Sequence, residues 1–148
     1  MRHGGQILVD HLKAEGIRRV YSVPGESFLA ALDGLHQSGI ENIVCCQEGG
    51  AAMMAEAHAK LTGEVGICFV TRGPGATNAS AGVHIARQDS TPMILFVGQI
   101  DTGHRDREAF QEVDYRQVFG GLAKWATEVD DIKRLPEYLS RAFHLAQS

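Results

Sequence analysis

The fold is decided by the sequence CQEGGAA at residues 46–52, where an apolar run meets an acid and an alanine-rich segment follows. The apolar run has the character of a buried strand, and the segment after Glu48 has the composition of a helix. The sequence TRGPGATN at residues 71–78 repeats the arrangement, with a tight Gly-Pro-Gly turn between strand and helix. Open α/β sheets bind ligands at such strand-to-helix turns. Both turns are therefore candidate ligand sites, and a buried acid at one of them needs a function because its burial is expensive.

Strand-like and helix-like segments alternate along the whole chain. The predicted strands are residues 19–23, 42–46, 65–71 and 92–97, and the predicted helices are residues 7–15, 26–36, 48–61, 75–88 and 132–146. Residues 98–115 predict a long charged loop, and residues 122–129 are ambiguous, with a strand as one interpretation. This alternation predicts the α/β class, with an open parallel sheet covered by helices on both faces.

Composition narrows the classes of function. The 148 residues suit one domain, and a hydrophobic share of 44% is ordinary for a soluble globular protein. A net charge of -4 gives no reason to expect nucleic acid or a membrane as partner. The N-terminus lacks the apolar core of a signal peptide, and three cysteines without a pairing pattern suit a reducing compartment, so we expect a cytoplasmic protein. The spacing of cysteines and histidines does not suit zinc.

Each motif has an ordinary interpretation when it is considered alone. Residues 24–27 (PGES) would then be a turn that caps the next helix. Residues 73–75 (GPG) would cradle a phosphate at a helix start, although they match neither the dinucleotide fingerprint nor the P-loop. Glu48 would be an acid stabilised by the helix dipole. The two alanine-rich helices suit either an ordinary core or burial against another subunit.

Five motifs together resemble one family, the N-terminal, pyrimidine-binding domain of thiamine-diphosphate-dependent enzymes in the branch of acetolactate synthase and its decarboxylase relatives. The motifs occur in the order and approximate spacing of that family, at residues 24–27, 47–52, 71–78, 98–99 and 109–114. The resemblance extends over nearly the whole chain. It implies the pyrimidine-binding type of the thiamine-diphosphate-binding fold.

The resemblance also implies roles for individual residues. Glu48 matches the glutamate that hydrogen-bonds a ring nitrogen of the cofactor's aminopyrimidine and moves a proton there, which activates the cofactor. Gln111 matches a glutamine that reaches the reacting centre, and Phe110 matches an apolar neighbour on the substrate side. The alternative for Phe110 and Gln111 is a mobile surface segment. The implied cofactor pocket contains Pro24, Gly25, Glu48, Thr71, Pro74 and Asn78.

Three positions depart from the acetolactate synthase pattern and leave the substrate undefined beyond a small 2-oxo acid. The chain has Glu26 where a glycine is usual, Gln47 where a histidine is usual and Arg72 where a serine is usual. Arg72 would contact a carboxylate or form a salt bridge at the surface, and we favour the surface salt bridge.

A larger departure concerns the diphosphate. Family members hold it through Mg²⁺ with a Gly-Asp-Gly motif of a C-terminal domain, and no Gly-Asp-Gly occurs here. We therefore expect residues 1–148 to form a single pyrimidine-binding domain without the last strand and without the central and diphosphate-binding domains. Such a domain holds no metal itself and carries half of a site. We expect it to be inactive alone, to form a homodimer or larger oligomer, and to need the diphosphate-binding domain of a second subunit.

Two rival functions stay open at this point. A nucleotide- or phosphate-binding Rossmann-like module explains the Gly-Pro-Gly turn, but Glu48 would repel a phosphate. A non-catalytic interaction domain would have kept the fold and lost the site, which the presence of both Glu48 and Gln111 disfavours.

Overall fold

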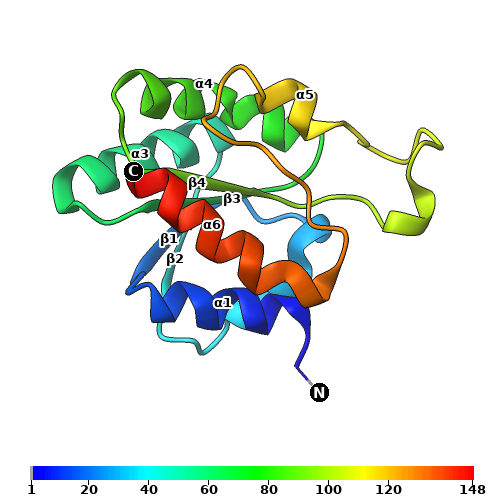
Figure 1. Cartoon of the computed structure of the whole chain (residues 1–148), viewed down its shortest axis with the longest axis horizontal. Helices are drawn as coiled ribbons and strands as arrows, with labels where there is room; N and C mark the ends of the chain where they lie inside the picture. The colour runs from blue at the N-terminus through cyan, green and yellow to red at the C-terminus, as the bar shows by residue number, and fades with distance from the viewer. Residues whose placement is uncertain (1) are drawn as a thin grey trace.

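A four-stranded parallel sheet forms the centre of the computed structural model, which describes residues 2–148 (Figure 1). Its strands are β1 (Arg19–Ser22), β2 (Glu41–Val44), β3 (Gly66–Val70) and β4 (Met93–Val97), in the spatial order β2-β1-β3-β4. Every neighbouring pair is parallel. Strand β3 is buried along its whole length, as expected for a central strand that is covered on both faces. The predicted open parallel sheet is confirmed.

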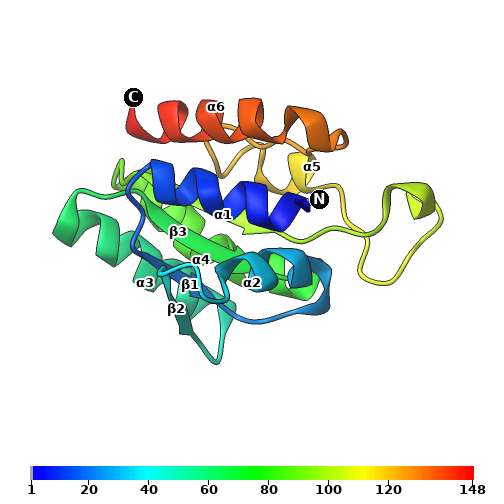
Figure 2. The same ribbon diagram turned by 90° about the horizontal axis from the view of Figure 1, so that it is seen from below.

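Helices cover both faces of this sheet, as predicted (Figures 1 and 2). One face packs against α1 (Gly4–Ala14), α2 (Leu29–Leu35) and α6 (Leu135–Gln147). The other face packs against α3 (Glu48–Thr62), α4 (Pro74–Gln88) and the short α5 (Tyr115–Phe119). Short 3-10 turns occur at Glu26–Phe28, Thr102–His104 and Ile132–Arg134.

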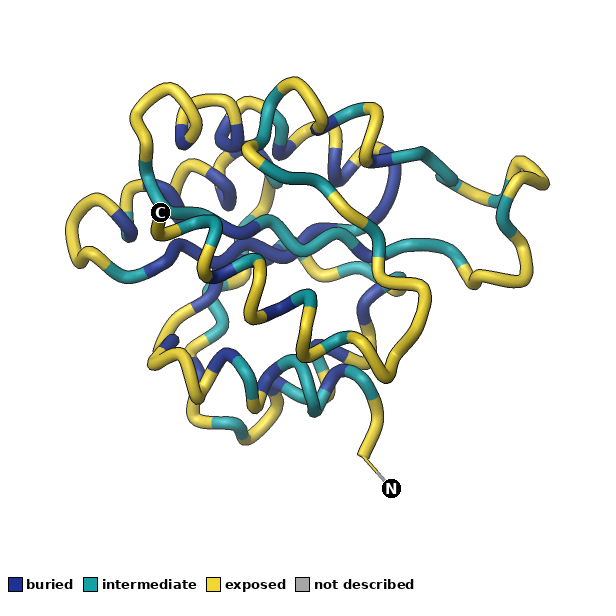
Figure 3. The backbone as a smooth tube through the Cα atoms, viewed as in Figure 1, coloured by how far each residue is buried: buried dark blue, intermediate teal, exposed yellow. Residues whose placement is uncertain are grey.

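The sheet divides the apolar interior into two cores. Successive strand residues point to opposite faces, so Ile67 and Phe69 of β3 lie in the core under α1, α2 and α6, whereas Cys68 and Val70 lie in the core under α3 and α4. Figure 3 shows the buried residues along the sheet and on the inner sides of the helices. Burial raises the pKa of the Cys68 thiol to about 12, so this cysteine is an unreactive core residue.

The alanine-rich composition of α3 and α4 allows these two helices to pack closely. A Cβ atom added at Gly82 of α4 would lie 2.5 Å from the Cβ of Ala52 and 2.8 Å from its carbonyl carbon. Ala51, Ala52 and Ala55 on the inner side of α3 are fully buried. The outward side of α3 carries exposed Met53, Met54 and Leu61, and the Leu61 side chain is 87% exposed. The interpretation as core helices is thus confirmed for their inner sides, and burial of the outer side of α3 against another subunit stays a prediction.

Some boundaries differ from the predictions for identifiable reasons. Helix α1 begins at Gly4, earlier than predicted, because His3 and Gln6 form a capping box. The predicted helix over residues 26–36 divides into a 3-10 turn and α2. A strand over residues 122–129 is wrong, because this segment runs between α4 and α6 and pairs with none of the four strands of the sheet. Arg87 donates to the carbonyl oxygen of Ala123 at 2.7 Å. None of the helices within residues 2–148 has the length and apolar character needed to cross a membrane.

We predict that Gly82→Val lowers the free energy of unfolding by about 1–3 kcal/mol, because the new side chain would overlap the backbone of α3. The matched control is Ala81→Val at the neighbouring, exposed position of the same helix, where only helix propensity changes, by about 0.6 kcal/mol. Urea unfolding measures both. Equal stability of the two variants would contradict the close packing of α3 on α4.

Candidate functional site

The loops that follow the four strands gather at one edge of the sheet, since the carboxyl ends of parallel strands lie together. They comprise residues 23–28 after β1, 45–47 after β2, 71–73 after β3 and 98–114 after β4. From β1 the sheet continues to β2 on one side and to β3 on the other. The boundary between β1 and β3 is therefore the topological switch point, where open α/β sheets bind ligands.

Glu48 lies beside this point, in the first turn of α3, and faces the start of α4. The Nδ2 atom of Asn78 donates to Oε2 of Glu48 at 3.0 Å. The second carboxylate oxygen, Oε1, has no hydrogen-bond partner among residues 2–148, and a Cβ on Gly75 would lie 3.4 Å from it. Glu48 is half-buried. The expectation of a buried acid is therefore only partly met.

Two glycines bring the first and third loops together around Thr71. A Cβ on Gly25 would lie 2.5 Å from the Cβ of Thr71, and a Cβ on Gly75 would lie 2.8 Å from its Cγ2. The hydroxyl groups of Ser27 and Thr71 share a hydrogen bond of 2.8 Å. The predicted residues Gly25, Thr71, Glu48 and Asn78 thus form one continuous group around Gly75. Glycine is needed at positions 25 and 75 because the side chain of Thr71 already fills the space that a Cβ would take.

The two prolines of the predicted pocket lie at its outer rim. Pro24 and Pro74 are both exposed. Pro74 occupies the first turn of α4, where a missing N–H costs nothing because helix-start N–H groups have no partner within the helix. The structure therefore places these two residues at the loop surface and the glycines in the interior of the group.

The loop of residues 98–114 projects beyond the sheet edge (Figures 1 and 2). It holds Gln111 against the turn after β3. Gln111 has a positive φ of 62°, and a Cβ on Gly73 would lie 2.8 Å from the Cβ of Gln111. The Gly73 N–H donates to the Tyr115 hydroxyl at 2.6 Å, and the Phe110 side chain lies outside, 72% exposed. Within the described residues no hydrogen bond joins Gln111 to Glu48, so the two predicted catalytic residues form separate clusters.

The expected salt bridge at Arg72 is present, but the arginine itself is buried and does not lie at the surface. Arg72 is 8% exposed, and its guanidinium pairs with the carboxylate of Glu26. Its Nε atom also donates to the carbonyl oxygen of Phe110 at 2.8 Å. A charge that is removed from water needs such partners. Two positions that separately depart from the family pattern therefore pair with each other, which sequence reasoning missed because the residues lie on different loops.

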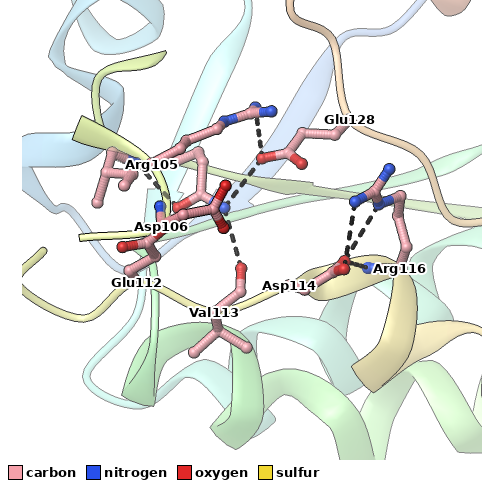
Figure 4. A network of polar contacts seen from close by, with 9 residues as sticks. Arg105, Asp106, Glu112, Val113, Asp114, Arg116 and Glu128 are labelled. Carbon is pink, nitrogen blue, oxygen red and sulfur yellow. Dashed lines mark hydrogen bonds and ion pairs between the residues drawn. The ribbon is translucent and has the colours of Figure 1, made fainter. Parts of the chain in front are cut away.

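A further polar network, also missed from the sequence, fastens the loop of residues 98–114 (Figure 4). Glu112 accepts the N–H groups of Asp106 at 2.7 Å and Ala109 at 3.0 Å, and these bonds lower the pKa of Glu112. Gln99 donates to the Val113 carbonyl and to Glu128, each at 3.0 Å. In the sequence, the high density of charged residues between positions 101 and 116 was the feature that could have indicated this network. Among residues 2–148, no group of three His, Cys, Asp or Glu side chains is arranged to hold a metal ion.

Comparison with known proteins gives a consistent result. Residues 2–118 match the family described as thiamine pyrophosphate enzyme, N-terminal TPP binding domain. The large subunit of acetolactate synthase isozyme 2 from Escherichia coli (strain K12) is 36% identical over 99% of this chain and 27% of its own length. Acetolactate synthase from Bacillus subtilis (strain 168) is 34% identical over 98% of this chain and 25% of its own length. The chain thus spans about a quarter of the length of these relatives.

We predict that the amide proton signals of Asp106 and Ala109 titrate together, with an apparent pKa below 4.5, the ordinary value for Glu112. The pKa of Glu112 is lowered in the folded chain. Its contribution to folding stability is therefore fully present above the ordinary pKa, and it is lost as the pH falls through the lowered, folded-state pKa. Proton NMR measures the shift of these two amide signals with pH, from about pH 2.5 to about pH 7, a range that contains the whole titration of a carboxylate. Glu112→Gln should abolish the transition, and a transition at or above 4.5 would contradict the two backbone hydrogen bonds.

Proposed function

The chain belongs to the family of thiamine pyrophosphate enzymes, as an N-terminal TPP-binding domain, and on this premise we propose that it binds the aminopyrimidine half of thiamine diphosphate with Glu48 as the activating acid. The enzyme that it serves would act on a 2-oxo acid in the manner of acetolactate synthase. One observation carries the proposal. Glu48 stands at the switch point with one oxygen held by Asn78 and the other free beside Gly75.

The residues around Glu48 fit a flat heteroaromatic ring. Such a ring needs a wall to lie against, and Thr71 forms one, because its side chain fills the space beside Gly25 and Gly75. It also needs a carboxyl group at hydrogen-bond distance from a ring nitrogen, and Oε1 of Glu48 is free to take that position. Asn78 keeps the carboxyl group in one orientation, because its amide donates to the opposite oxygen. The carboxyl group of Glu48, held by the Asn78 amide, therefore suits an aminopyrimidine.

The division of chemistry between cofactor and protein follows. Thiamine diphosphate, when bound, supplies a carbon that becomes a nucleophile on losing a proton and then holds the electrons of the substrate. Glu48 holds and moves a proton at its free oxygen Oε1. Thr71 and Gly25 form the wall beside it, and Gln111 and Phe110 lie on the loop toward the substrate side. Glu48 and Gln111 are thus the proposed catalytic residues of this chain.

The other half of the site would come from elsewhere. We assign the diphosphate and its Mg²⁺ to a diphosphate-binding domain of a second subunit, which the chain's coverage of about a quarter of its relatives supports. Exposed Met53 and Met54 on α3, together with Ile85 on α4, offer an apolar surface for a homodimer or larger oligomer. The chain alone would be one pyrimidine-binding domain, inactive without that partner. Three unpaired cysteines suit a cytoplasmic location.

The geometry of the Gly-Pro-Gly turn disfavours the phosphate-binding rival. A phosphate cradle needs free backbone N–H groups. The N–H of Gly73 is already bonded to the Tyr115 hydroxyl, and the N–H of Gly75 to the carbonyl oxygen of Arg72 at 3.4 Å. Pro74 has no N–H. The turn therefore has few donors left for an anion.

We predict that Glu48→Gln lowers turnover and the rate of hydrogen–deuterium exchange at the cofactor's reactive carbon by at least about 100-fold. The reason is that an amide at this position cannot donate and accept a proton as a carboxyl group does. The measurement uses the complete protein that joins this domain to the diphosphate-binding one, and thermal unfolding should be unchanged. Glu41→Gln is the matched control, since Glu41 is exposed at the amino end of β2, away from the site. Normal turnover by Glu48→Gln would contradict the assignment.

A further inference from the structure

Glu26 and Arg72 form an ion pair that the proposed chemistry does not use. Arg72 directly follows Thr71 after β3, and Glu26 directly follows Gly25 after β1. The arginine is buried, whereas the Glu26 side chain is 69% exposed. Other charges nearby have partners of their own. Arg105 pairs with Glu128 at 2.6 Å and His104 lies 3.4 Å from Asp101, which leaves Glu26 as the counter-charge of Arg72.

Arg72 reaches from this pair to the loop of residues 98–114. Its Nε donates to the carbonyl oxygen of Phe110 at 2.8 Å, and its guanidinium carbon lies 5.7 Å from the centre of the Phe110 ring. One side chain therefore connects the loop that carries Gly25 with the loop that carries Gln111. The ring of Phe110 is otherwise largely open to solvent, so Arg72 is a principal contact of this segment.

The segment needs such a restraint, because its backbone is unfavourable on its own. Gln111 has a φ of 62°, and Glu108 nearby has a φ of 53°. Left-handed backbone costs a residue with a side chain about 1 kcal/mol or more, so it persists only when surrounding contacts impose it. Arg72 on Phe110, together with Gly73 against Gln111, supplies contacts of this kind on the side of the turn after β3.

We propose that Arg72 is a positioning residue, which Glu26 orients, and that it holds Phe110 and Gln111 at the mouth of the pyrimidine pocket. The pair also lines a shallow depression of about 350 Å³, whose other walls include Gln99, Asp101, Ala109 and Phe110. A substrate that approaches from this side meets a wall whose shape the ion pair fixes. The consequence for substrate depends on the proposed function, whereas the restraint on the loop is a property of this chain alone.

Amide hydrogen exchange on the full chain tests the restraint. Arg72→Met should accelerate exchange over residues 109–113 by about tenfold, because local opening of a segment becomes easier when its contacts are lost. Glu26→Gln should accelerate exchange in the same residues to a smaller extent. Arg72→Lys should restore part of the protection, because it keeps the charge but loses the Nε donor.

A double variant separates positioning from simple stabilisation. Glu26 makes no hydrogen bond to residues 109–113 among the described residues, so its effect must pass through Arg72. In the Arg72→Met background, Glu26→Gln should therefore add nothing. Arg19→Met, which breaks the exposed ion pair with Glu41 near the opposite sheet edge, is the control and should leave residues 109–113 unchanged. Unaltered exchange in Arg72→Met, or exchange that rises equally over the whole chain, would overturn the proposal.

Kinetics in the complete enzyme give the second measurement. Arg72→Lys should raise KM for the 2-oxo acid by about tenfold while the affinity for thiamine diphosphate is unchanged, because Phe110 and Gln111 lie on the substrate side. Unchanged KM would overturn the role at the substrate side. A complete protein that binds no thiamine diphosphate would instead refute the proposed function and leave the exchange experiment as an independent test.

Discussion

The close approach of α3 and α4 is the constraint on which the rest of the site depends. The helices can come together because position 82 carries no side chain, and a Cβ at Gly49 would lie 3.1 Å from the carbonyl oxygen of Asn78. Both helices start at the carboxyl edge of the sheet, after β2 and β3 respectively. Their contact therefore brings Glu48, in the first turn of α3, within hydrogen-bond distance of Asn78 on α4. A bulkier pair of helices would separate the acid from the amide that orients it.

The candidate site has two parts, one on elements that pack in the cores and one on a loop that polar contacts hold in place. Glu48, Asn78 and Thr71 lie on helix starts and a strand end, which the two cores hold in place. The proposed substrate-side residues, Phe110 and Gln111, lie on a projecting loop, which is held by polar contacts such as Arg72 on Phe110 and Glu112 on two backbone N–H groups. This distribution suits the proposed roles, because a group that transfers a proton needs a fixed geometry and residues that meet a substrate need adaptability.

The sequence predicts the parts of this structure that depend on local pattern. The alternation of apolar runs and helices specifies the parallel sheet, and the ordered motifs identify Glu48 and Asn78 before any contact is known. It does not predict the pairing of Glu26 with Arg72, because that contact joins two loops through tertiary structure. The irregular segment at residues 122–129 was equally hard to predict, since it bonds to helices in place of a neighbouring strand. Arg87 of α4 donates to the Ala123 carbonyl oxygen, and Lys124 donates to the Leu145 carbonyl oxygen in α6. The half-burial of Glu48 depends on what covers the strand ends, which local sequence does not encode.

The most direct test of the central claim is a titration of the isotope-labelled chain, followed by amide NMR, with thiamine, thiamine diphosphate and inorganic pyrophosphate in turn. If Glu48 and its neighbours bind the aminopyrimidine, thiamine and thiamine diphosphate will shift the same amides, at Gly25, Glu48, Gly75 and Asn78. Their affinities will be weak, similar and indifferent to Mg²⁺, because the diphosphate anchor lies outside this site. Shifts at residues 73–75 with pyrophosphate alone, or tight binding that requires Mg²⁺, would contradict the account and identify a phosphate site.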